Sequence, residues 1–185
     1  MLEIIIPEQE YFDRATMEFC YVTKPVKLRL EHSLISIAKW EMKWHKSYFS
    51  DYKKATYEES FDYIRCMLLD PPPPDEVLKC ISSEDAQRIK DYIEDPMSSV
   101  TFSEHEGGRD LRRKKHLANE DVYSSMIALG MDAAHYEKWH INRLLTLIRV
   151  VSIDQSPPKK GSRSQTMDHY MRLNAKHRKA LNSKG

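Results

Sequence analysis

The 185-residue sequence has few of the residues that build disulfide-rich or membrane-spanning proteins. It contains three cysteines, five glycines and no apolar run near the roughly 20 residues of a membrane span. Cys20, Cys66 and Cys80 are odd in number and share no short spacing, which argues against a disulfide framework and against a zinc site. Glu3 and Pro7 interrupt the only apolar start, so no secretory signal is expected. These absences predict a cytoplasmic protein with reduced thiols and no membrane contact.

The sequence also lacks a catalytic motif. No Ser or Cys stands in a nucleophile elbow, and no glycine-rich phosphate loop is present. His135 and His140 are five residues apart and miss the i, i+4 spacing that suits two metal ligands on one helix. The run Glu104-His105-Glu106-Gly107-Gly108 is typical of a mobile polar loop. We therefore predict that the chain is not an enzyme and holds no metal or cofactor.

Charge is distributed unevenly along the chain. From Ser156 to Gly185 there are eight basic residues and one acid, which gives +7 and leaves −6 for the preceding residues, since the whole chain carries +1. The basic residues are Lys159, Lys160, Arg163, Arg172, Lys176, Arg178, Lys179 and Lys184. An acidic body with a basic arm favours either an anionic partner for the arm or tethering of the arm to the body.

Nucleic-acid binding is one interpretation of these basic residues, because cationic arms bind phosphate by releasing counterions. A second basic run, Arg109 to Lys115, adds to the signal. Tyr170 is the single aromatic residue of the tail, so the tail has little aromatic surface to stack on unpaired bases, which argues against this interpretation. Nucleic-acid binding therefore remains an alternative to the main prediction.

The apolar pattern predicts an α+β, mostly α, domain over residues 1–153 with a small N-terminal β-sheet. Short apolar or alternating runs indicate strands at Leu2–Ile6, Glu18–Val22 and Val26–Leu30. After Leu30 the period becomes helical and predicts a helix to about His45.

Capping signals predict the later helices. Four helix starts are expected: at a capping box formed by Thr56 and Glu59, at a serine cap on Ser82 or Ser83, at a cap near Asn119, and at a cap on Asp132. The last of these helices is expected to run through Val151. Val100–Phe102 is expected to be a strand. Residues 154–185 are predicted to form a basic, largely flexible linker and tail, in which residues 164–181 favour a helix.

All three tryptophans fall within two segments of helical pattern, residues 39–46 and 137–145. Sequence neighbours on a helix lie about 100° apart, so an adjacent Trp and His cannot both face one ligand. We predict that Trp40, Trp44 and Trp139 anchor the core or a partner surface, with His140 and Arg143 beside Trp139.

Several strings are distinctive: Thr23-Lys24-Pro25, Leu30-Glu31-His32-Ser33-Leu34-Ile35-Ser36, Lys39-Trp40-Glu41, Trp44-His45, Tyr63-Ile64-Arg65-Cys66, Ile93-Glu94-Asp95-Pro96, Lys138-Trp139-His140-Ile141-Asn142-Arg143-Leu144-Leu145, and the stretch from Leu173-Asn174-Ala175 to Leu181-Asn182. From about Tyr21 onward the chain resembles the tail assembly chaperones of long-tailed bacteriophages, which are encoded beside the tape-measure protein.

The resemblance implies a non-enzymatic protein that helps tail-tube subunits gather around the tape-measure protein and leaves before the particle is finished. Proteins of this kind resemble a helical body with a charged extension, often lengthened by a ribosomal frameshift, and Pro157-Pro158-Lys159-Lys160 can be encoded by a slippery run of C and A. The alternatives are a nucleic-acid-associated phage or host protein acting through its basic tail, and a permanent tail or neck component of the virion.

Overall fold

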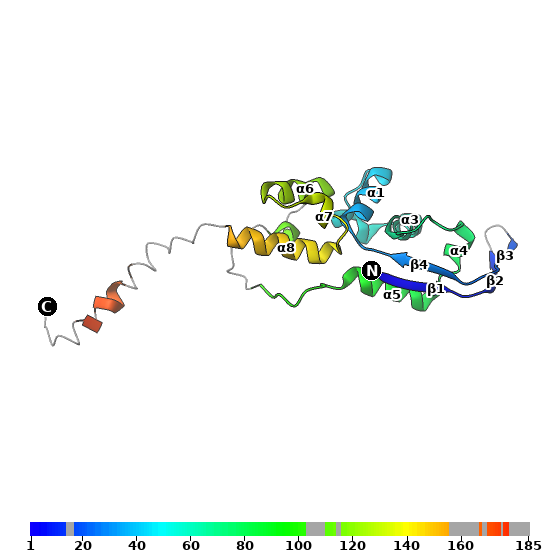
Figure 1. The fold of residues 1–185 in the computed structure, drawn as a ribbon, viewed down its shortest axis with the longest axis horizontal. Helices are drawn as coiled ribbons and strands as arrows, with labels where there is room; N and C mark the ends of the chain where they lie inside the picture. The colour runs from blue at the N-terminus through cyan, green and yellow to red at the C-terminus, as the bar shows by residue number, and fades with distance from the viewer. Residues whose placement is uncertain are drawn as a thin grey trace. The chain divides into compact units, whose positions relative to one another are not determined.

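A computed structural model describes residues 1–13, 17–102, 110–113, 116–155, 167, 170–174 and 176–177. The chain divides into two units, Met1–Asp154 and Gln155–Gly185. The first unit, here called the body, is mostly helical and has its β-strands at the N-terminal end, so the predicted α+β class is confirmed (Figure 1). Across these described ranges, no helix is both long and apolar enough to cross a membrane.

The elements of the body follow one another in a simple order. They are β1 (Leu2–Ile6), β2 (Gln9–Asp13), β3 (Glu18–Val22), β4 (Val26–Leu30), α1 (Leu34–Trp44), α2 (Tyr48–Asp51), η1 (Tyr52–Lys54), α3 (Tyr57–Met67), α4 (Asp75–Lys79), α5 (Ser83–Glu94), η2 (Leu111–Arg113), α6 (Asn119–Ala128), α7 (Ala133–Tyr136) and α8 (Ile141–Asp154).

The four strands form two antiparallel pairs that lie one after the other along a single hairpin. β1 pairs with β4, with Ile6 opposite Val26, and β2 pairs with β3, with Gln9 opposite Val22. Between the two pairs, the chain from β1 to β2 contains Pro7 and Glu8, and the chain from β3 to β4 contains Thr23, Lys24 and Pro25. Each of these two connections therefore contains a proline. Proline has no N–H to donate to a ladder, so the hairpin is interrupted there. β2 was not expected from the sequence.

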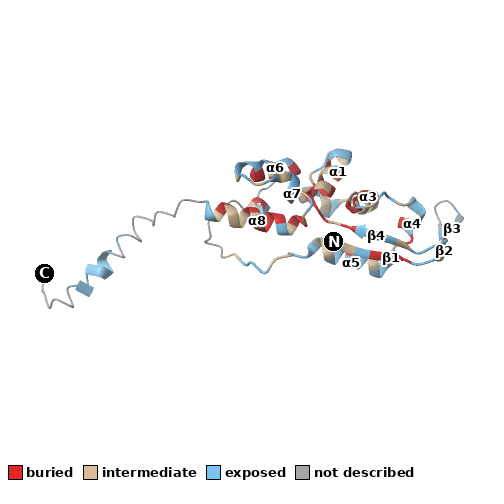
Figure 2. Cartoon of the chain, viewed as in Figure 1, coloured by how far each residue is buried: buried red, intermediate tan, exposed pale blue. Residues whose placement is uncertain are grey.

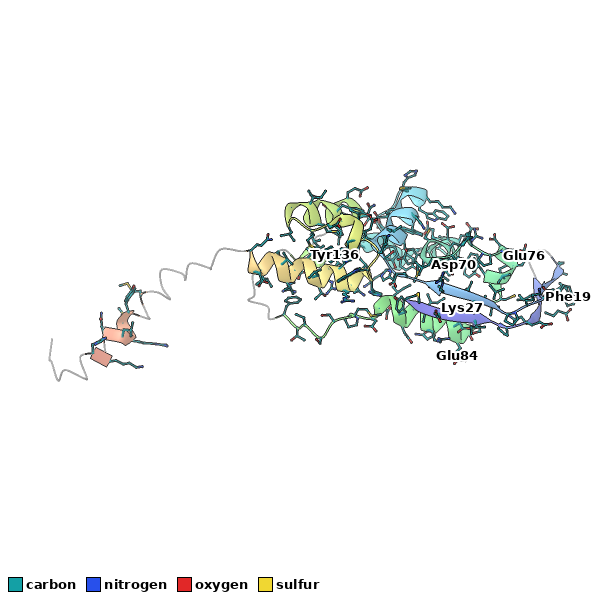
Figure 3. All side chains as sticks on the ribbon, viewed as in Figure 1. Phe19, Lys27, Asp70, Glu76, Glu84 and Tyr136 are labelled. Carbon is teal, nitrogen blue, oxygen red and sulfur yellow. The ribbon has the colours of Figure 1, made fainter. Side chains whose placement is uncertain are left out.

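One face of the β1–β4 pair supplies part of the core. Ile4, Ile6, Leu28 and Leu30 alternate with exposed residues and are at most 2% exposed. The other face is exposed and carries both charged residues and Ile5. Lys27, labelled in Figure 3, forms an ion pair there with Glu3 on β1. This alternation is the period of a half-buried strand.

Side-chain caps set the starts of α3 and α5, as the sequence indicated, whereas the residue that precedes α6 is Ala118, which has no capping side chain. The Thr56 amide donates to Glu59 at 2.8 Å and the Glu59 amide donates to the Thr56 hydroxyl at 3.2 Å, which confirms the capping box. Ser82 caps α5 through the Asp85 amide at 3.0 Å. Ser33 caps α1, which therefore begins at Leu34 rather than near Leu30.

Two local expectations were wrong. Val100–Phe102 belongs to no strand, because the chain there pairs with no neighbouring strand among the described residues. The helix expected from Asp132 to Val151 is broken into α7 and α8. In the break, Ser33 and His140 form an antiparallel bridge, so contact with a distant segment overrides the local helical period.

The core takes its buried side chains from the β1–β4 pair and from helices that include α1, α3, α5, α6 and α8, and Figure 2 shows buried residues in red. The Glu41 carboxylate is buried within it and accepts hydrogen bonds from the Tyr48 amide at 2.7 Å and from the Asn119 amide at 3.0 Å. A buried carboxylate needs such donors. Glu41 thereby joins α1 to α2 and α6.

Beyond Gln155, the second unit is helical at the positions that the structure describes in it, residues 167, 170–174 and 176–177. Arg172 and Lys176 are exposed there. The other basic tail residues lie outside the described residues: Lys159, Lys160, Arg163, Arg178, Lys179 and Lys184.

Candidate functional site

The three tryptophans, predicted as a group, occupy three different environments. Trp40 has no exposed surface, and its indole N–H donates to the Glu59 carbonyl oxygen at 2.8 Å. Trp44, one turn later on α1, is half-buried, and so is Trp139 in the turn between α7 and α8. Trp40 is therefore a core residue, while Trp44 and Trp139 reach the surface.

Trp44 lines a groove of about 430 Å³ formed by α1, α3 and α4, here called the Trp44 groove. Its wall on α3 carries Tyr57 and Phe61, one turn apart, with near-parallel rings 6.1 Å apart. Tyr57 is 79% exposed. The Arg65 guanidinium covers the Phe61 ring at 5.3 Å and extends this ladder by another turn. The groove thus presents a strip of aromatic surface to solvent.

Two of the basic side chains at the Trp44 groove are paired with acidic side chains. Asp62 accepts from the Lys43 ammonium at 2.5 Å and from the Trp44 indole N–H at 3.0 Å. Arg65 forms an ion pair with Asp75 across the groove. Burial, with the Asp62 carboxylate as a second cause, raises the pKa of the neighbouring Cys66 to about 11, so this thiol stays protonated at neutral pH.

A second, smaller pocket of about 310 Å³ lies at the turn between α7 and α8, here called the Trp139 pocket. The turn is held against the segment before α1: the Ile141 amide donates to the His32 carbonyl at 2.8 Å, beside the Ser33–His140 bridge. Trp139 packs on the ring of Tyr136, labelled in Figure 3, at 4.9 Å. These contacts fix the backbone that carries Trp139.

The string Lys138-Trp139-His140-Ile141-Asn142-Arg143 separates into an inner and an outer set. Ile141 is 1% exposed, and the Asn142 side chain donates to two carbonyl oxygens at the end of α5. Lys138 and Arg143 are exposed, and the Arg143 guanidinium lies over the Trp139 ring at 4.2 Å. The outer set, Lys138, Trp139 and Arg143, is the part that a partner can reach.

His140, predicted to join the partner surface, uses both ring nitrogens within the body. Nδ1 accepts from the Asn142 amide at 3.3 Å, so Nε2 carries the proton and donates to the Tyr92 carbonyl oxygen at 2.9 Å. Burial lowers the pKa of His140. At neutral pH this imidazole is therefore uncharged, and it supports the pocket from beneath.

A second buried imidazole lies next to His140. The ring centroids of His32 and His140 are 5.1 Å apart, and His32 Nδ1 lies 2.5 Å from the Tyr63 hydroxyl. Burial, with His140 as a second cause, lowers the pKa of His32 to about 3. In the part of the chain that the structure describes, no three His, Cys, Asp or Glu residues are grouped to hold a metal ion.

Sequence reasoning named Trp44, Trp139 and Arg143 but missed three of their neighbours. The spacing of Tyr57 and Phe61 on α3 predicts that both face inward, whereas Tyr57 is exposed. Apolar residues on α3 also include Tyr63 and Met67, on the buried face. A helix with more apolar residues than one stripe can hold signals a second apolar face. Lys138 lies in the distinctive string around Trp139 but was not predicted to belong to the partner surface.

Comparisons with protein-family models, with curated proteins and with solved structures return no match for this chain.

Proposed function

We propose that this chain is a non-enzymatic assembly chaperone of long-tailed bacteriophages, which binds the tape-measure protein, the tail-tube protein or both during tail morphogenesis in the host cytoplasm. The resemblance of its sequence strings to that family suggests the role. The observation that carries it is the aromatic strip of the Trp44 groove, which is held on a well-packed body and left open to solvent.

The chemistry of the Trp44 groove suits an apolar helical partner. Exposed aromatic side chains dominate protein–protein contacts, and a groove between helices accepts the apolar face of another helix. Two cations of the groove, Lys43 and Arg65, already have acidic partners, so neither is left unpaired when an apolar face covers the groove. Tape-measure proteins are expected to be long and helical, which gives them such a face.

The test is co-expression of this chain with the tape-measure and tube proteins of the same phage. Tyr57→Ala removes the most exposed ring of the groove and should reduce co-purification about tenfold, the usual effect of losing an interface anchor. Ile127→Ala is the matched control, because Ile127 is 71% exposed on α6, outside the groove. It should leave co-purification unchanged.

Two results would overturn this function, and each identifies an alternative. Persistence of the chain in purified particles would make it a permanent tail or neck component. Nucleic-acid binding that falls steeply with salt and depends on Lys159, Lys160 and Arg163 would favour the nucleic-acid-associated protein. A chaperone should instead be absent from mature particles, and its gene should lie beside a tape-measure gene.

A further inference from the structure

The Trp139 pocket differs from the Trp44 groove in whether its basic side chains form ion pairs. Lys138 and Arg143 are both exposed at its rim. Among the residues with described placement, neither has a carboxylate within ion-pair distance. Both positive charges are therefore available to an incoming group.

Arg143 is also positioned for one particular kind of group. The Trp139 indole supports one face of its guanidinium at 4.2 Å, a cation–π geometry that restricts the side chain and leaves the N–H edge free. A planar guanidinium matches a carboxylate with two parallel hydrogen bonds, which an ammonium cannot do. Stacking on Trp139 thus orders the Arg143 guanidinium before a ligand binds.

The only carboxylate lining the Trp139 pocket in the described structure is already engaged. Glu31 accepts from the Tyr92 hydroxyl at 2.6 Å and pairs with the Met1 ammonium at 2.8 Å. The nearby Asp95 carboxylate accepts from the Met97 amide at 2.7 Å. The pocket therefore carries net positive charge.

We propose that the Trp139 pocket binds an acidic segment of a protein partner, with one Asp or Glu carboxylate paired to Arg143 and a neighbouring acid paired to Lys138. The pocket volume of about 310 Å³ accommodates a side chain rather than a helix. This inference rests on the proposed function, because it assigns a chemistry to the second surface through which such a chaperone would hold its partner.

The experiment follows the three tryptophan indole N–H signals of the full-length chain by NMR, during titration with a hexaglutamate peptide. Trp139→Phe assigns its signal by deletion. We expect the Trp139 signal to shift, while the Trp40 signal stays in place because that indole is buried and hydrogen-bonded. Acid bound only to the basic tail would leave the Trp139 signal unmoved, and that result would overturn the proposal.

Arginine variants distinguish specific binding of a carboxylate by the Arg143 guanidinium from nonspecific electrostatic attraction. Arg143→Gln should raise the peptide concentration for half of the shift about tenfold, and Arg143→Lys should recover only part of the loss. Arg88→Gln is the matched control, an exposed arginine on α5 that pairs with Asp85, and should change nothing. An equal loss in Arg88→Gln, or an equal response to inorganic phosphate, would overturn the assignment to carboxylate.

The two proposals can fail separately. If tape-measure and tube proteins do not co-purify but hexaglutamate still shifts Trp139 through Arg143, the chaperone role fails and the acid-binding pocket stands. If the tail proteins co-purify equally well with Arg143→Gln and hexaglutamate causes no shift, the pocket fails and the chaperone role stands.

Discussion

The Trp44 groove and the Trp139 pocket use the same residue types in opposite electrostatic states. Around Trp44, Lys43 is paired with Asp62 and Arg65 with Asp75, so the aromatic strip lies in a locally neutral setting. Around Trp139, the exposed cations have no described acidic partner, and one of them is stacked on the indole. A tryptophan beside basic residues therefore does not by itself predict the chemistry of the partner. The placement of carboxylates decides whether the surface favours an apolar or an acidic partner.

The largest expected effect separates the core tryptophan from the surface ones. Trp40→Ala should lower the free energy of unfolding by about 3–5 kcal/mol, because it leaves a cavity in the core and removes the hydrogen bond from the indole to the Glu59 carbonyl oxygen. Trp139→Ala should cost about 1 kcal/mol, since the ring is only half-buried. Chemical denaturation of both variants measures the difference. Equal losses would mean that Trp139 is also a core residue.

A smaller effect tests the paired charges of the Trp44 groove. Asp62 is 6% exposed and accepts from both Lys43 and the Trp44 indole, so Asp62→Ala should cost about 2 kcal/mol of stability. Asp75→Ala, which removes an exposed partner of Arg65, should cost less than about 0.5 kcal/mol.

The first of these variants also sharpens the comparison between the two surfaces. Asp62→Ala unpairs Lys43 and makes the Trp44 groove resemble the Trp139 pocket. Hexaglutamate should then shift the Trp44 indole signal, which we expect it to leave unchanged in the parent chain. If the Trp44 signal of this variant does not shift, an unpaired lysine beside a tryptophan is insufficient for acid binding, and the stacked arginine is required.

A third effect arises from the imidazoles beneath the Trp139 pocket. The folded chain keeps His32 uncharged because its pKa is about 3, whereas in the unfolded chain the pKa is near 6.5. Below pH 6.5 the unfolded state binds more protons, so stability is complete above that pH and is lost as the pH falls toward 3. His140, whose pKa is also lowered by burial, adds to the loss.

Between pH 7.5 and 5.5 this should lower the free energy of unfolding by about 1–2 kcal/mol. Denaturation curves at the two pH values measure it. His135→Gln is the control, because that exposed histidine should leave the pH dependence unchanged. A stability independent of pH over this interval would contradict the buried, neutral imidazoles.

The sequence predicted the elements whose signals are local. The capping box at Thr56 and the serine cap at Ser82 were correct because each involves residues within one helical turn. β2 was missed because its sequence, Gln-Glu-Tyr-Phe-Asp, is mostly polar and its pairing with β3 is what makes it a strand. The break before Ile141 depends on His32, more than a hundred residues earlier, which no local pattern contains.

The candidate sites were predicted only by residue type. The sequence selected the tryptophans and Arg143, but it could not separate Trp40, which is buried, from Trp44, one turn away on the same helix. Which side of a helix faces the core depends on the elements packed against it. The pairing state of Lys43 and Arg143 likewise depends on carboxylates from other elements, so the contrast between the two surfaces emerges only from the fold.

The hydrogen bond from the Ile141 amide to the His32 carbonyl has a consequence for how the body opens. It joins two segments that are distant in sequence and lies beside fully buried side chains, so solvent can reach it only when α8 separates from the segment before α1. In hydrogen–deuterium exchange, the Ile141 amide should report global unfolding, whereas amides of the more exposed β2–β3 pair should exchange through local opening. One backbone amide can thus measure the stability of the whole body.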